Sequence, residues 1–258
     1  MTDVLVCIKR VPGSSGEVLL SHDEQSVDAR HVGWTVSPHE EAAVEVATQV
    51  AGSTSGTVTV LTVGSVDAVE QLRDALAVGC SDAVLVEADP TALGPRDVAA
   101  AIAGVVETRA AAGRSYDLVL LGNDAADSGD FQVPVRLAYA LGRPVVTGIS
   151  TCQIVGDTVE ARGDGPDGPE VYELPLPAVV AVMEGGVAPR YPSVMGRMKA
   201  KKAPVEHQVF ERDAVGGGRV RLTLPPVQPS KVQLLGEGAD AAPAVVDLFE
   251  KLGVVAIR

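Results

Sequence analysis

A loop at residues 122–130, Gly-Asn-Asp-Ala-Ala-Asp-Ser-Gly-Asp, has the residue types of a turn that binds an anion or a nucleotide. It follows an apolar run at residues 117–121 and precedes a predicted helix at residues 131–141. In open α/β sheets, ligands bind beyond the carboxyl ends of the strands, where backbone N–H groups and a helix N-terminus attract negative charge. The aspartates of the loop would repel a phosphate, so we expect the backbone, Ser128 and Gly129 to hold it. The loop is therefore a candidate nucleotide site that needs a second wall.

The segment Ser-Pro-His-Glu at residues 37–40 could supply that second wall. It combines a serine cap, a proline at the first helical position and a glutamate three residues after the cap, which is the pattern of a helix start. The helix that follows is expected to bury Ala43, Val46, Ala47 and Val50. An ordinary capping box without a ligand is the alternative interpretation of the same residues.

The segment at residues 185–205 reverses the charge of the chain. It contains five cations and no acid, whereas the formal net charge of the whole sequence is −13. This reversal predicts a docking surface for an acidic partner or a cofactor phosphate. A solvated helix face is the alternative. The cations are Arg190, Arg197, Lys199, Lys201 and Lys202.

Other reactive residue types lack the surroundings that catalysis requires. Residues 163–168 match G-x-G-x-x-G, but Pro169 and a strand-like run follow where a dinucleotide site needs a helix, so a hairpin turn is predicted. Cys7 lies within an apolar strand, where a thiol is usually inert packing. The four histidines are widely separated, with no H-E-x-x-H or G-x-S-x-G motif, so the hydrolase and metalloenzyme hypotheses lose support.

The composition excludes several classes of protein. With 258 residues, 46% hydrophobic and only 3% aromatic, the chain can build a large aliphatic core but offers few rings for stacking on bases. Its negative charge disfavours nucleic acid and anionic lipid as partners. No apolar run is long enough to span a bilayer, and no signal peptide is recognisable. Three widely spaced cysteines fit a reducing compartment such as the cytoplasm.

Strand-like and helical patterns alternate through the first 150 residues. Strands are predicted at residues 4–8, 57–63, 83–86, 117–121 and 145–149, and helices at residues 66–78, 96–112 and 131–141 in addition to the capped helix, which ends at Gly52. This alternation predicts an α/β fold, with a mostly parallel sheet and helices on both faces.

The pattern changes after residue 150. Residues 152–162 and 170–183 are predicted strands, which implies an antiparallel addition to the sheet. From there to a predicted helix at residues 241–252 we expect no long periodic element, because glycines and prolines interrupt the chain. We therefore divide the chain into an α/β nucleotide-binding domain, residues 1–202, and an extended C-terminal arm, residues 203–258, that lies on a partner subunit.

Several stretches together resemble the β subunit of electron transfer flavoprotein, and the resemblance covers nearly the whole chain. They read Val-Leu-Val-Cys-Ile-Lys-Arg-Val-Pro at residues 4–12, Ser-Pro-His-Glu-Glu-Ala-Ala-Val-Glu at 37–45, Leu-Val-Leu-Leu-Gly at 118–122, Leu-Pro-Ala-Val-Val at 176–180, Pro-Arg-Tyr-Pro-Ser at 189–193 and Met-Lys-Ala-Lys-Lys at 198–202.

The resemblance implies a fold like that of the adenine-nucleotide α-hydrolase group and an electron carrier without turnover of its own. It implies pairing with a larger α subunit that carries most of the FAD site, while this chain buries one AMP in the crevice described above. Carried over to this sequence, the nucleotide contacts are Cys7, Ser37, Pro38, His39, Glu40, Val63, Gly122, Asn123, Asp124, Ala125, Asp127, Ser128, Gly129, Asp130, Phe131, Gln132 and Val133.

The resemblance also implies a recognition loop whose leucine anchor docks into acyl-CoA dehydrogenases and related flavoenzymes. The electrons then pass to a quinone-reducing acceptor. Val194 stands at the position of the anchor. The implied docking residues are Arg190, Tyr191, Pro192, Ser193, Val194, Met195, Arg197, Lys199, Lys201 and Lys202.

The sequence departs from the family pattern at Gly13, at His39 and at residues 195–197. Gly13 replaces a frequent aspartate, and His39 stands where an aromatic residue often faces the flavin. Two alternatives stay open: a bifurcating type of subunit that holds a second FAD where AMP would lie, and a stand-alone nucleotide-binding protein of the same fold.

Overall fold

The computed structural model describes residues 1–14, 17–211, 213–217, 220–226 and 232–254. The chain forms two compact units, Met1–Thr223 and Leu224–Arg258. The larger unit contains the sheet and its helices, and the smaller contains a short 3₁₀ helix, η2 (Gly238–Ala241), and α6 (Ala242–Lys251), in agreement with the helix predicted at residues 241–252.

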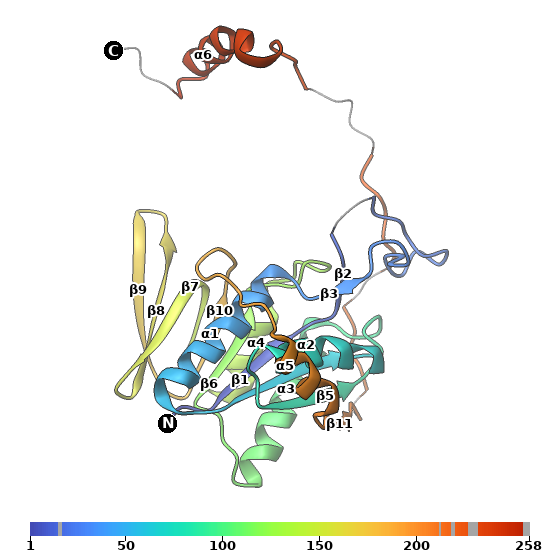
Figure 1. Ribbon diagram of the computed structural model, residues 1–258. Coiled ribbons are helices and arrows are strands. Elements are labelled where there is room, and N and C mark those ends of the chain that lie inside the picture. The colour runs from blue at the N-terminus through green and yellow to red at the C-terminus, as the bar shows by residue number, and fades with distance from the viewer. Residues whose placement is uncertain (15–16, 212, 218–219, 227–231, 255–258) are drawn as a thin grey trace. The chain divides into compact units, whose positions relative to one another are not determined.

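A nine-stranded sheet is the framework of the larger unit (Figure 1). Its order is β11-β5-β4-β1-β6-β10-β7-β8-β9, and every neighbouring pair up to β7 is parallel, whereas β7, β8 and β9 pair antiparallel. The strands are β1 (Val4–Ile8), β4 (Val58–Gly64), β5 (Asp82–Glu87), β6 (Leu118–Gly122), β7 (Val145–Val155), β8 (Thr158–Gly165), β9 (Gly168–Pro175), β10 (Ala178–Val182) and β11 (Glu206–Val209). A separate two-stranded sheet joins β2 (Val11–Pro12) to β3 (Trp34–Thr35).

Helices cover both faces of the parallel part, as the alternating pattern predicted. On one face, α1 (Pro38–Thr54) and α2 (Val69–Ala77), which follows η1 (Val66–Ala68), share a core with Val4 and Val6 of β1. On the other face, α3 (Pro95–Ala111) and α4 (Val133–Leu141) pack against Leu5 and Cys7 of the same strand. Because successive strand residues point to opposite faces, one continuous apolar run fills both cores.

Two of the predicted strands have wrong boundaries. Residues 152–162 are not one strand, because Gly156, at φ +63°, turns the chain between β7 and β8. Residues 170–183 belong partly to β9 and partly to β10, which enters the parallel sheet between β6 and β7. The five residues of β10 are all buried, as is typical of a central parallel strand. The hairpin predicted at residues 163–168 is confirmed, since Gly165 of β8 pairs with Gly168 of β9.

A helix that the sequence did not predict, α5 (Val194–Lys202), follows β10. The Ser193 hydroxyl caps it by accepting the Gly196 N–H at 3.0 Å. The Arg73 guanidinium of α2 donates to the carbonyl oxygens of Ala200 and Lys201 at its C-terminal end. Ala200 is its only buried residue among those described, so α5 lacks the apolar stripe by which sequence patterns reveal a helix.

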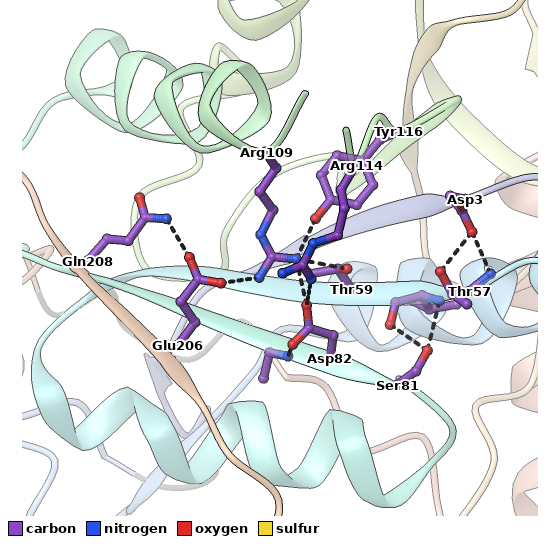
Figure 2. Close-up of polar contacts among 12 residues, drawn as sticks. Asp3, Thr57, Thr59, Ser81, Asp82, Arg109, Arg114, Tyr116, Glu206 and Gln208 are labelled. Carbon is purple, nitrogen blue, oxygen red and sulfur yellow. Dashed lines mark hydrogen bonds and ion pairs between the residues drawn. The ribbon is translucent and has the colours of Figure 1, made fainter. Parts of the chain in front are cut away.

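A buried arginine, Arg109, joins β11 to the neighbouring strand β5 near the amino ends of both strands. Figure 2 shows the Arg109 guanidinium of α3 between two carboxylates, and Arg109 Nη1 lies 2.5 Å from Asp82 Oδ2 at the start of β5. The same Nη1 atom donates to the Tyr116 hydroxyl at 2.9 Å, and Nη2 lies 2.5 Å from Glu206 Oε2 at the start of β11.

None of the described helices combines the length and the apolar character that crossing a bilayer requires.

Candidate functional site

A crevice opens at the carboxyl ends of β1, β4 and β6, where the N-termini of α1 and α4 converge. It encloses about 920 Å³ when the space at its open mouth is included. Twelve of the residues predicted from the sequence line it: Cys7, Glu40, Val63, Gly122, Asn123, Asp124, Ala125, Ser128, Asp130, Phe131, Gln132 and Val133. The other five, Ser37, Pro38, His39, Asp127 and Gly129, lie in the same two segments but are not part of the lining.

The close approach of β6 to α1 depends on Gly122. A Cβ atom at this position would lie 2.8 Å from the Glu40 Cγ atom and 3.0 Å from the Glu40 backbone nitrogen. A larger residue would require the Glu40 side chain and the start of α1 to shift, so glycine favours the close approach of the end of β6 to α1. This contact joins the two predicted walls into one crevice.

The carboxylate of Glu40 is buried at the start of α1. It accepts the Ser37 N–H at 2.8 Å and also the Ser37 hydroxyl, so the capping interpretation of these residues is confirmed. Burial raises the pKa of Glu40 to about 7, although these hydrogen bonds and the charge of Lys9 oppose the shift. Because Glu40 also lines the crevice, the capping and site interpretations apply to the same side chain.

His39 does not line the crevice, but its imidazole contacts Glu184 and Asp124. Its Nδ1 atom accepts the Glu184 N–H at 2.9 Å, so a neutral imidazole carries its proton on Nε2. That Nε2 atom lies 3.0 Å from Asp124 Oδ1. The two groups are not aligned for a hydrogen bond, and within the described residues the buried Asp124 Oδ1 atom has no hydrogen-bond donor. Asp124 Oδ1 therefore lies against the His39 imidazole without an aligned hydrogen bond.

The loop at residues 122–133 has the backbone of an anion-binding turn. Gly129 and Phe131 have φ values of +57° and +54°, and the second is rare for a residue with a side chain. Within the described part of the chain, the N–H groups of Asp130 and Phe131 have no hydrogen-bond acceptor. The N–H groups of Val133 and Val135 at the start of α4 add to them, since a helix leaves its first donors unpaired, whereas Pro134 between them has no N–H. Lys9, a lining residue, lies 2.6 Å from Asp127 at the back of the loop.

The sequence analysis missed a third wall, which comes from the loop after β5 and the start of α3. Pro90, Leu93, Pro95, Val98 and Ile102 line it. No motif marks these residues, because their place beside the crevice depends on β5 lying next to β4. The remaining lining residues that were missed flank predicted ones: Ile8, Lys9, Leu61, Leu121 and Pro134.

The third wall is backed by a segment from the far end of the larger unit. The Asp97 carboxylate in the first turn of α3 accepts the N–H groups of Gly94, Val215 and Gly216 at 2.8–2.9 Å. Burial opposes ionisation of Asp97, but these three donors outweigh it and lower its pKa. The start of the predicted arm, residues 203–258, is therefore bound to α3 of the larger unit.

Cys7 lines the crevice at the end of β1, but its thiol is not activated. Burial alone raises its pKa far above the usual range, so it stays protonated at neutral pH. Packing, as expected from the sequence, accounts for this residue.

Comparison with known proteins decides the family. A model of the electron transfer flavoprotein domain matches residues 26–211. The chain is 33% identical over 254 residues to the electron transfer flavoprotein subunit beta of Bacillus subtilis strain 168, covering 96% of this chain and 97% of the relative. It belongs to the electron transfer flavoprotein β-subunit family. The β subunit of Mycobacterium tuberculosis strain H37Rv is 31% identical, with 92% of both chains covered, and that of Megasphaera elsdenii is 29% identical, with 97% of both covered.

In this member of the β-subunit family, an apolar and cationic surface surrounds α5. We define the α5 surface by its exposed side chains, Tyr191, Val194, Met195, Met198, Arg197, Lys199, Lys201 and Lys202. Val194 is 77% exposed at the first position of the helix. Arg190 differs from the other cations, since its guanidinium is bound to Glu45 of α1 at 2.7 and 2.8 Å. The remaining cations form no ion pair with any described residue.

Proposed function

We propose that this chain is the small subunit of a heterodimeric electron transfer flavoprotein and that it binds one AMP in its crevice. The observation that carries the proposal is the convergence of the free loop donors, the start of α1 and the ends of three parallel strands. Convergent polar groups in an otherwise apolar pocket at this edge of a sheet are typical of nucleotide sites.

The residues of the crevice fit the parts of AMP. The N–H groups of Asp130, Phe131 and the start of α4 suit a phosphate, because backbone donors do not depend on side-chain charge. The Asp124 Oδ1 atom, whose contact with His39 Nε2 is not an aligned hydrogen bond, suits a hydroxyl or amino donor of the nucleoside. Leu61, Val63 and Ile102 provide apolar contact area for a base.

We propose AMP rather than a second FAD as the occupant of the crevice. Glu40, Asp124 and Asp130 line it, with Lys9 as the one cation among the described lining residues. The backbone donors of the loop suit one phosphate group. AMP would contribute stability and no chemistry.

The redox chemistry would be that of FAD, which accepts and releases electrons and is held mainly by the α subunit. We propose that the chain acts as an electron carrier and not as an enzyme, in the cytoplasm. It would receive electrons from acyl-CoA dehydrogenase-type flavoenzymes, as in fatty acid oxidation, and pass them to a quinone oxidoreductase. The α5 surface would dock these partners. Of the predicted arm, residues 203–258, the part beyond the larger unit, residues 224–258, would pack on the α subunit.

The proposal is tested by co-expressing the chain with its α subunit and identifying the nucleotides that the denatured complex releases by liquid chromatography and mass spectrometry. We expect one AMP and one FAD per heterodimer. Two FAD molecules would indicate the bifurcating type of subunit, and no adenine nucleotide would contradict the assignment of the crevice. A monomer that keeps its nucleotide without the α subunit would support the stand-alone alternative.

A further inference from the structure

A second hollow, which we name the α1–α2 groove, lies between these two helices and the segment at residues 189–197. It encloses about 1310 Å³ with its open mouth included, and Ile8, Val36, Val44, Ala75 and Val78 form its apolar part. It is distinct from the crevice that α1 borders at its N-terminus, although Ile8 lines both. It adjoins the α5 surface, because Tyr191 and Arg197 belong to both.

The groove contains more negative charge than it can neutralise. It is lined by Glu41, Glu45, Glu70 and Asp74 and by two cations, Arg190 and Arg197. Arg190 is already occupied by Glu45, and the other three carboxylates form no ion pair with any described residue. Local burial raises the pKa of Asp74, with a further contribution from the charge of Glu70 and an opposing one from Arg197. Burial likewise raises the pKa of Glu41, so both carboxylates are partly desolvated, and neither forms an ion pair with a described residue.

Gln71, on the wall of the groove, has an unused acceptor. Its side chain is only 4% exposed, and its Oε1 atom has no hydrogen-bond donor in the described part of the chain. A buried polar atom without a partner destabilises a protein, so its presence calls for a ligand that donates to it. Three carboxylates and an amide oxygen all accept hydrogen bonds, and together they select a cationic donor.

We propose that the α1–α2 groove receives an arginine side chain of the flavoenzyme that docks on the α5 surface. The inference rests on the proposed carrier function and adds the chemistry of the partner. A guanidinium has five donors in a plane and no acceptor, which matches a groove lined by carboxylates and an amide oxygen. The aliphatic stem of an arginine would lie on the apolar part of the groove.

The groove and the α5 surface would then bind groups of opposite charge on the same partner. The cations of α5 favour an acidic surface, while the neighbouring groove accepts one cation, so a uniformly acidic protein would not satisfy both. Such alternation fixes the orientation of a short-lived complex and rejects partners that lack the arginine.

The sign of one charge effect tests the proposal. Heterodimers carrying Asp74→Asn, or Asp74→Asn with Glu41→Gln, are mixed with an acyl-CoA dehydrogenase-type donor in a stopped-flow instrument, and FAD reduction is followed at several salt concentrations. If only the α5 cations guided an acidic partner, removing a neighbouring negative charge would leave the rate unchanged or raise it. An arginine in the groove predicts the opposite, a reduction rate about fivefold lower at low salt.

Asp67→Asn is the matched control, because Asp67 is an exposed acid in η1 that does not line the groove. Its rate should equal that of the parent or exceed it. Rates for Asp74→Asn that match those of Asp67→Asn would overturn the inference while leaving the carrier function intact. A parent heterodimer that retains FAD, accepts electrons from dithionite and is not reduced by any flavoenzyme would instead contradict the proposed function and the inference with it.

Gln71→Met separates docking from folding. Removal of the unpaired buried acceptor should raise the thermal midpoint of the heterodimer, while the loss of a hydrogen-bond acceptor for the arginine should lower the reduction rate about threefold. A variant that is both more stable and reduced at the parental rate would show that Gln71 takes no part in docking and would contradict the inference.

Discussion

Arg109 of α3 and Glu206 of β11 form a direct ion pair, with 2.5 Å between Nη2 of the arginine and Oε2 of the glutamate. Only 5% of the Arg109 side chain is exposed, and its charge is shared with Asp82. A guanidinium that is withdrawn from water to this extent requires such partners. The ion pair therefore stabilises β11, the short strand that follows α5, at the edge of the sheet beside β5.

We expect Arg109→Met to lower the free energy of unfolding by about 3 kcal/mol, because it leaves Asp82 and Glu206 without their common counterion. Urea denaturation followed by circular dichroism measures the change. Arg114→Met is the matched control. Arg114 Nη1 lies 3.7 Å from Asp82, and its side chain is 65% exposed, so its loss should change the stability by less than about 0.5 kcal/mol. Equal effects of the two substitutions would contradict a special role for the buried arginine.

Glu40 should make the stability of the chain fall as the pH rises from about 4.5 to about 7. Its pKa of about 7 in the folded chain lies above the usual glutamate value of 4.5, so Glu40 ionises first in the unfolded chain across this window. The native state binds more protons there, and its stability decreases by an amount on the order of 3 kcal/mol.

Glu40→Gln keeps an acceptor for the Ser37 N–H and removes the titrating group. In urea denaturation, the free energy of unfolding of the variant should fall less than that of the parent between about pH 5 and about pH 7.5. Parallel pH profiles of the two proteins would show that Glu40 does not ionise in this range.

Gly122→Ala should abolish nucleotide retention and destabilise the chain by roughly 1–3 kcal/mol, because the added methyl group would overlap the start of α1. Nucleotide content after purification and the thermal midpoint are the measurements. Gly104→Ala is the control: nothing lies within 4 Å of a Cβ atom at this position of α3, so it should stabilise the helix by about 0.5–1 kcal/mol and leave the nucleotide bound.

Reversal of Lys199, Lys201 and Lys202 to glutamate should slow reduction by a flavoenzyme donor and flatten its salt dependence, because charge on this rim governs the rate of encounter. Val194→Ala should weaken docking at every ionic strength. Val194→Leu should be tolerated or tighten docking by roughly 0.8 kcal/mol, the value of one buried methylene. FAD should remain bound in all three. Stopped-flow rates for the triple variant equal to the parental rates at low salt would show that these lysines have no docking role.

The helix α6 carries Val245, Leu248, Phe249 and Leu252 at helical spacing, in the helix or directly after it. If this stripe packs on the α subunit, Phe249→Asp should reduce the FAD retained by the co-purified pair, whereas Glu250→Lys, next to it on the sequence, should not. Absorbance of bound flavin per heterodimer measures retention. Full retention in Phe249→Asp would indicate that α6 makes no essential contact with the partner.

The sequence predicted the elements whose signals are local. The capped start of α1, the apolar run of β1 and the turn between β8 and β9 all depend on neighbouring residues, and each lies where it was expected. The order of the strands is a long-range property. For that reason β10 was read as part of an antiparallel pair, and the wall formed by Pro90 and Leu93 was not found.

The same distinction applies to the candidate site. The segments at residues 37–40 and 122–133 were predicted to share a crevice, and the contact of Gly122 with Glu40 brings them together. The contact of Asp124 with His39 and the raised pKa of Glu40 depend on the three-dimensional arrangement, which spacing along the chain does not reveal. The ion pairs of Arg109 with Asp82 and Glu206, which we call the arginine clamp, were missed because the three residues are far apart in sequence and follow no motif.

The arginine clamp lies at the amino ends of the parallel strands, and the crevice lies at their carboxyl ends. Asp82 and Glu206 begin their strands, whereas Val63 and Gly122 stand at the ends of theirs. Asp82 pairs with Thr59 of β4, four residues or roughly 13 Å before Val63 along that strand. Free-energy changes at sites this far apart usually add without coupling. Natural variation can therefore adjust the thermal tolerance of this subunit at one edge while selection on the ligand acts independently at the other.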